Sequence, residues 1–110
     1  MKRIPNRRKK PAMQSPSLFT VVLDYRGGTY ISQVEAQDVL GALRTWAQDL
    51  DHRPIFQFGL ARKQDLIRRI AEDIEWGETP VLLDGLSNAW CTSVLFSGGI
   101  GQINIVKTAR

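Results

Sequence analysis

The chain has 110 residues, with 15 Lys and Arg against 11 Asp and Glu, 43% hydrophobic residues, nine glycines and one cysteine. A chain of this length can bury one core without disulfides, and a single cysteine excludes an internal disulfide. Cys91 and His52, alone of their types, cannot supply a set of soft ligands for structural zinc. No apolar stretch approaches the roughly 20 residues that cross a bilayer. We therefore expect one soluble α+β domain with no cofactor and no membrane association.

Positive charge is concentrated at the N-terminus. Six of the first ten residues are basic and none is acidic, whereas from Pro11 onward nine basic residues are set against eleven acidic ones. Residues 1–17 also contain three prolines and show no hydrophobic period. We therefore predict a disordered basic tail over residues 1–17 and a single domain over residues 18–110. The basic residues of the tail are Lys2, Arg3, Arg7, Arg8, Lys9 and Lys10.

The segment after the tail predicts a β-hairpin. Residues 18–25 and 29–36 are rich in β-branched and aromatic side chains and flank Gly27-Gly28. Glycine at both positions permits the positive φ angles that a two-residue type I′ turn requires. With this loop, Val21 pairs with Val34 on a mostly apolar face, while the opposite face is mixed.

The C-terminal segment predicts a second hairpin of the same kind. A second pair of adjacent glycines follows residues 88–97, which alternate apolar and polar side chains toward the turn. A two-residue loop there places Val94 opposite Ile103 on the apolar face. Gly101 has no side chain, so the ring of Phe96 can lie over its backbone.

Two amphipathic helices are predicted between the hairpins. Asp38 suits the N-cap of the first helix, whose apolar residues recur at three- and four-residue spacing up to Leu50. Pro54 ends this helix because it disfavours helical geometry in the residue before it. The second helix is predicted from Ala61 to Glu75, with an apolar stripe toward the core and charged residues toward water.

This β-β-α-α-β-β order predicts a two-layer α+β sandwich, in which a four-stranded antiparallel sheet carries both helices on one face. The pattern leaves the strand order open. The other sheet face is uncovered and mixes apolar with polar side chains, which suits an ordinary solvated sheet and also a face that binds a partner. The expected partner-binding residues of this open face are Val22, Asp24, Ile31, Gln33, Cys91, Leu95, Gln102, Asn104 and Val106.

No catalytic set is visible in the sequence. A nucleophilic cysteine needs a base, and nothing brings His52, in the loop before Pro54, beside Cys91. Asp24 and Asp84 are single carboxylates near turns, where this residue type is common. Neither glycine pair connects a strand to a helix N-terminus that could hold phosphate. We therefore do not expect an enzyme.

Two resemblances bear on function. Phe19 to Leu50, a hairpin with Gly-Gly-Thr-Tyr followed by a helix with Ala42-Leu43, resembles the start of HicB-type antitoxin domains over less than a third of the chain. Residues 23–33 and 83–91 are similar to segments of small uncharacterised bacterial proteins, and this resemblance implies a compact cytoplasmic bacterial domain without naming an activity.

Together these features predict a small intracellular domain that binds a protein partner or associates with itself through the open sheet face. An antitoxin or immunity protein is one version of this prediction. The alternative is a nucleic-acid-binding accessory protein that acts through its basic tail, since six lysines and arginines can contact phosphates whatever the base sequence.

The alternative is testable through its salt dependence. If the tail binds nucleic acid, six phosphate contacts make the affinity fall about a thousandfold between low and moderate salt. Deletion of residues 1–12 should then abolish binding of a short labelled duplex, measured by fluorescence anisotropy across a salt series. Unchanged binding by the truncated chain would place the site in the domain and contradict the charge argument.

Overall fold

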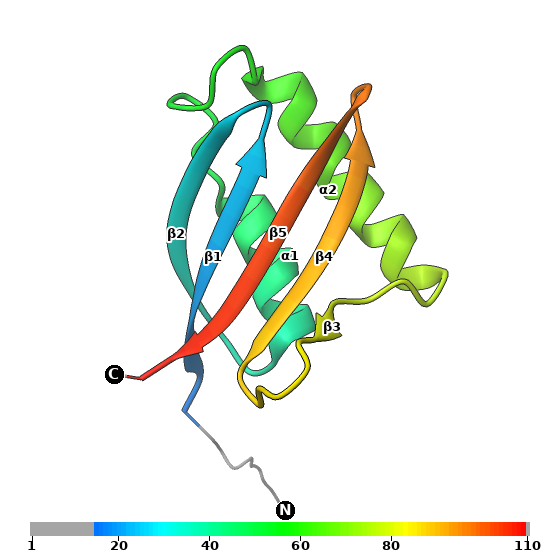
Figure 1. Ribbon diagram of the computed structural model, residues 1–110. Helices are drawn as coiled ribbons and strands as arrows, with labels where there is room; N and C mark the ends of the chain where they lie inside the picture. Colours follow the sequence, from blue (N-terminus) through cyan, green and yellow to red (C-terminus); the bar gives the residue numbers. More distant parts are fainter. Residues whose placement is uncertain (1–14, 110) are drawn as a thin grey trace, which may run out of the picture.

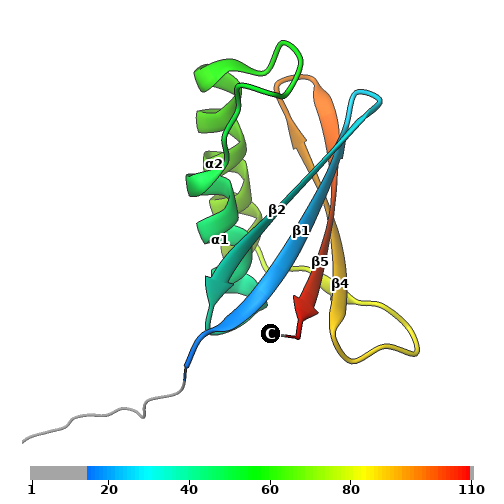
Figure 2. The ribbon, with the colours of Figure 1, turned by 90° about the vertical axis from the view of Figure 1, so that its left-hand side faces the viewer.

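An antiparallel sheet of five strands, with two helices on one of its faces, makes up the fold (Figures 1 and 2). The structure is a computed structural model that describes residues 15–109. The predicted tail therefore lies outside the described residues, except for its last three positions. The strands are β1 (Ser17–Tyr25), β2 (Gly28–Ala36), β3 (Val81–Leu82), β4 (Ala89–Phe96) and β5 (Gly99–Thr108), and the helices are α1 (Val39–Asp49) and α2 (Gly59–Glu75).

The predicted two-layer α+β class is confirmed, but the prediction of four strands is wrong. Strand β3 is a fifth strand, which pairs Val81 with Cys91 and Leu82 with Trp90 at the edge of the sheet. The strand order is β2-β1-β5-β4-β3, so β1 and β5 lie at the centre. Two residues are too few to show a period, and β3 is defined by its pairing with β4.

Both hairpins turn one residue earlier than their glycine pairs predict. The turn residues are Arg26 and Gly27 in the first hairpin, with φ of 49° and 80°, and Ser97 and Gly98 in the second, with φ of 48° and 75°. One glycine is therefore enough for each turn, because a non-glycine residue takes the first left-handed position. Pairing shifts by two residues along each hairpin, so every side chain stays on its predicted face.

The second glycine of each pair is a strand residue that a tyrosine covers. The phenol of Tyr30 lies over Gly28, and a Cβ atom on Gly99 would stand 3.2 Å from the ring of Tyr25. A side chain at either position would collide with a ring or force it to move. These glycines therefore serve close packing within the strands.

The apolar faces of both hairpins meet the helices, as the alternation predicts. Val21 and Ile103 are fully buried, and Val34 and Val94 are 8% and 2% exposed. The predicted cover of Gly101 is confirmed, since a Cβ atom there would stand 3.0 Å from the ring of Phe96. The helices contribute to the same core with Ala42, Leu43, Trp46, Ala47, Leu66 and Ile70.

The helix ends follow local signals in the sequence. Asp38 is the N-cap of α1, as predicted, and its side chain accepts a hydrogen bond of 2.8 Å from the backbone N–H of Gly41. Helix α2 begins at Gly59, two residues before the predicted start at Ala61. It ends at Glu75, and Gly77 follows with a φ of 86° that suits glycine.

Polar side chains of α2 hold the turn of the β4–β5 hairpin. The backbone N–H and hydroxyl of Ser97 donate to Asp65 at 2.7 and 3.0 Å, and Arg62 donates to the Ser97 carbonyl at 3.1 Å. Arg62 also donates to the hydroxyl of Tyr25, at 3.1 Å. Hydrogen bonds from Arg68 and Ser97 lower the pKa of the Asp65 carboxyl below its usual value. The carboxylate therefore stabilises a turn residue with a left-handed backbone.

We expect Asp65→Asn to lower the free energy of unfolding at pH 7 by about 1 kcal/mol, because charge-assisted hydrogen bonds are lost. The folded-state pKa of Asp65 is lowered, so this stabilisation is present above about pH 4 and is lost as the pH falls further. Urea unfolding at pH 7 and pH 3 should therefore show a smaller pH dependence in the variant than in the wild type. Asp49→Asn is the control on an exposed helix end, and equal pH dependence in wild type and Asp65→Asn would contradict this role.

Candidate functional site

The face of the sheet opposite the helices is the candidate site (Figure 2). Side chains alternate along each strand, so the residues next to the buried ones point to this face. Ile31 and Leu95 are 66% and 56% exposed there. All nine residues predicted for this open face lie on it, with Asp24 and Gln33 exposed and the other five half-buried: Val22, Cys91, Gln102, Asn104 and Val106.

One row of side chains crosses the open face from edge to edge. The register places Ile31, Val22, Asn104, Cys91 and Val81 next to one another on the five strands. Four of these five side chains are apolar or nearly so, and the two at the ends are about two-thirds exposed. We call this set the middle row. It carries no charge, which is typical of the centre of a protein interface.

Apolar side chains also lie at the hairpin end of the open face. Leu95 of β4 and Ile100 of β5 pair directly and are 56% and 60% exposed. Leu95 was predicted as a binding residue and Ile100 was not, although both flank the same turn. The apolar part of the face is therefore larger than predicted.

Polar side chains on either side of the middle row bind to one another. Their hydrogen-bonding groups are already partly satisfied within the face, so a partner could cover them at a lower desolvation cost than isolated polar groups. The bonds are Thr29 donating to Asp24 (2.5 Å), Gln33 donating to Thr20 (3.0 Å), Thr20 bonded to Thr108 (2.6 Å) and Ser93 donating to Gln102 (2.7 Å).

Asn104 is the exception among these polar groups. It lies half-buried on the central strand β5, between Val22 and Cys91, and its side chain forms no hydrogen bond with any other residue between 15 and 109. A side-chain amide offers two donors and one acceptor. The centre of the face therefore presents a polar group that a bound surface can satisfy.

Cys91 and His52 are not brought together. Cys91 is half-buried on the open face, whereas His52 lies in the connection between α1 and α2, which belongs to the helical layer. Over residues 15–109, no group of three or more His, Cys, Asp and Glu residues could hold a metal ion. The helices of this described part include none long and apolar enough to span a bilayer.

A group of exposed apolar side chains in one segment of the chain was not predicted. It lies between α2 and β4, where Trp76 is 84% exposed and Leu82, Leu83 and Leu86 are 36–50% exposed. The sequence does contain a signal for it, because Val81-Leu82-Leu83 is an apolar run without a partner strand of similar length. Val81 of the same segment lies in the middle row, whereas Leu82 pairs with Trp90 and points to the other side of the sheet.

The chain matches no family model, and neither the curated proteins nor the solved structures contain a match. The resemblances to HicB-type antitoxins and to small bacterial proteins stay predictions. Function must therefore be inferred from the open face itself.

Asn104→Val should stabilise the domain by about 1 kcal/mol, because it replaces an amide that has no hydrogen-bond partner among residues 15–109 by a β-branched apolar side chain on a central strand. The gain would indicate that Asn104 serves binding at a cost to stability. Urea unfolding measures this change. Gln102→Val is the matched control on the same strand, and it should be destabilising since it removes the hydrogen bond from Ser93. A less stable Asn104→Val variant would contradict the interpretation of Asn104.

Proposed function

We propose that the domain binds a partner protein through its open sheet face, with the middle row at the centre of the contact. The observation that supports this proposal most directly is an uncharged row of side chains that crosses all five strands and that no helix covers. The fully buried centre of a protein interface is depleted of charge in the same way.

The side chains of the face define the chemistry of the partner. Its surface is apolar where it meets Val22, Ile31 and Val81, and it offers a hydrogen-bonding group to the amide of Asn104. Asp24 is a charged residue two positions from Val22 on β1, and its carboxylate already accepts a hydrogen bond from Thr29. The partner therefore needs a surface that fits the shape of the apolar row and one hydrogen-bonding group opposite Asn104, more than it needs a positive charge opposite Asp24.

An antitoxin or immunity protein is the version of this proposal that the resemblance over residues 19–50 favours. Such a protein acts by covering a target, so it needs an exposed face and no catalytic group. A toxin-like reading frame next to the gene would supply the target, and its product could be titrated directly against this chain.

Nucleic-acid binding through the basic tail is the second candidate. The observation that favours it is the run of six basic residues among the first ten, with no acidic residue between them. The salt series and the 1–12 deletion test this candidate independently of the open face.

Leu95→Lys should abolish capture of the partner, because it places a charge on the apolar surface that the partner covers. Leu60→Lys is the matched control, since Leu60 is also a leucine, is also 56% exposed, and lies at the start of α2 away from the open face. Tagged wild type and both variants are used for affinity capture from cell extract, followed by titration with the captured protein.

The proposal requires one protein that wild type and Leu60→Lys retain and that Leu95→Lys loses. Titration should show at least about tenfold weaker binding by Leu95→Lys, which corresponds to about 1.4 kcal/mol. Equal retention by all three chains, or no retained protein at all, would contradict binding through the open face.

A further inference from the structure

Strand β2 forms one edge of the sheet and, within residues 15–109, pairs with a strand on one side alone. It pairs with β1 on one side through nine consecutive residue pairs, and Figure 2 shows no strand or helix beyond its other side. Tyr25 and Gly28 flank the two-residue turn and form a hydrogen-bonded pair, so alternate residues of β2 bond to β1. Thr29, Ile31 and Gln33 direct their backbone N–H and C=O groups away from β1. Over residues 15–109, no backbone hydrogen bond joins these groups to another element.

The two edges of the sheet are protected very differently. At one edge, β3 has only two residues and leads into a turn at Gly85, so this edge is divided between β3 and residues 92–96 of β4, which β3 does not reach. At the other edge, β2 has nine residues with no proline, lysine or arginine, and its continuous register shows no bulge. A long, regular and unprotected edge strand is a template for pairing with another strand.

We propose that β2 of one copy pairs with β2 of a second copy, antiparallel and with Ile31 on the two-fold axis. In this register Ile31 faces Ile31 of the second copy, and Thr29 faces Gln33 on both sides. Thr29, Ile31 and Gln33 then all lie in hydrogen-bonded pairs. Ile31 is 66% exposed in the single chain, and the pairing gives it an apolar neighbour on the open face.

The distribution of charge along β2 favours a second copy of this chain as the strand that pairs with its edge. Residues 28–34 carry no charged side chain, so like charges do not meet at the axis. The antiparallel arrangement also brings Arg26 at the turn of one copy near the start of α1 in the other, where Asp38 carries a negative charge. This contact occurs twice because the interface is symmetric.

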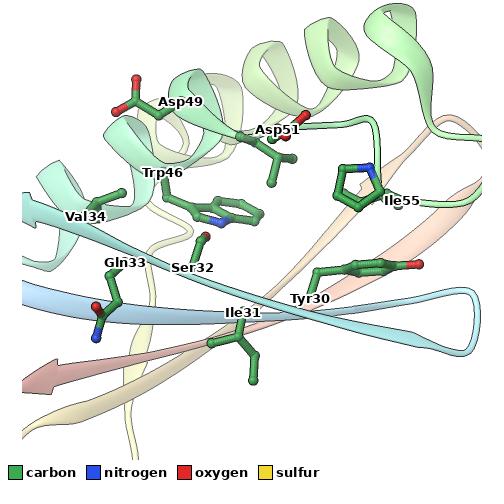
Figure 3. A pocket seen from close by; sticks show the side chains of 11 residues that line it. Tyr30, Ile31, Ser32, Gln33, Val34, Trp46, Asp49, Asp51 and Ile55 are labelled. Atoms are coloured by element: carbon green, nitrogen blue, oxygen red, sulfur yellow. The ribbon is translucent and has the colours of Figure 1, made fainter.

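The second copy would also close a cleft beside β2. Tyr30, Ser32 and Val34 point from β2 toward Trp46 of α1 and Ile55, and they line a cavity of about 210 Å³ (Figure 3). The next strand of an extended sheet lies about 4.8 Å from β2, across the mouth of this cavity. Its helix-side residues would therefore cover apolar surface that the single chain leaves partly open.

The pair would form one continuous ten-stranded sheet with the open faces of both copies on the same side. Residues that face each other on paired strands lie on the same face of the sheet, so the two middle rows would adjoin at Ile31. Self-association through the β2 edge leaves the open face available to a partner protein. The inference therefore does not depend on the proposed function.

Disulfide trapping tests the axis directly. In a Cys91→Ala background, Ile31→Cys should form a covalent dimer under mild oxidation, because hydrogen-bonded antiparallel pairs have Cα atoms about 5.5 Å apart, within the range of a disulfide. Ile100→Cys is the control, since Ile100 is similarly exposed on the open face but lies on β5. Preferential cross-linking at Ser32→Cys or Gln33→Cys would overturn the register, and no cross-linking at any of the three β2 positions would overturn the edge pairing.

Sedimentation equilibrium tests the association without a covalent bond. Wild type should show twice the mass of one chain at high concentration, and Ile31→Lys should raise the dimer dissociation constant about tenfold, because it removes the apolar pair and places like charges on the axis. Ile100→Lys should leave the dimer intact. A monomeric wild type, or equal association by both lysine variants, would overturn the proposal.

The outcome is distinguishable from failure of the proposed function. Leu95→Lys should lose the partner protein yet keep the dimer mass, whereas Ile31→Lys should weaken the dimer. If a chain of different sequence occupies the β2 edge, wild type would sediment as a monomer, and this result would overturn pairing with a second copy.

Discussion

The structure depends on the burial of alternate side chains of β1 and β5 against the two helices. These central strands place Val21, Leu23, Ile103 and Ile105 in the core with no exposed surface. Tyr25 extends this core toward the turns, where its ring stacks on Phe96 with centroids 5.0 Å apart. Since a shift by one residue would turn these side chains toward water, the core determines which side chains are left for the open face.

The open face is a consequence of the same alternation. Two helices are enough to cover one side of this sheet, so the residues between the core residues remain uncovered. On most surfaces such residues are polar, but here an uncharged row crosses the sheet and is interrupted by the amide of Asn104. An apolar row with one polar group at its centre combines burial energy with specificity, and both are useful for protein binding.

The two edges of the sheet add a second asymmetry. Strand β3 has two residues, whereas β2 has nine and carries no proline, lysine or arginine. A sheet that can be extended at one edge and covered on one face has two separate ways to contact other chains. Edge pairing would use backbone hydrogen bonds, and the face would use side chains, so Leu95→Lys affects the face alone, whereas Ile31→Lys affects the edge and the middle row together.

Local signals were sufficient for much of the fold. The period of two predicted the faces of both hairpins, the spacing of apolar residues predicted both helices, and Asp38 was identified as an N-cap because its side chain suits that position. The predicted face residues, including Val22 and Asn104, lie where alternation placed them. The predicted turn positions were wrong by one residue. A glycine pair can supply both residues of a type I′ turn, or the second turn residue and the first residue of the next strand. The packing of tyrosines on Gly28 and Gly99 distinguishes these two arrangements.

Sequence alone therefore determined the class of fold, the two helices and the side of the sheet to which each strand residue points, since these follow from short-range periodicity and steric preference. The tertiary structure decided the strand order, the short strand β3, and the neighbours of each residue across the sheet. These features depend on pairing between segments far apart in the chain, such as Val22 with Asn104, which no local pattern encodes. The middle row and the free edge of β2 became visible only when that pairing was known.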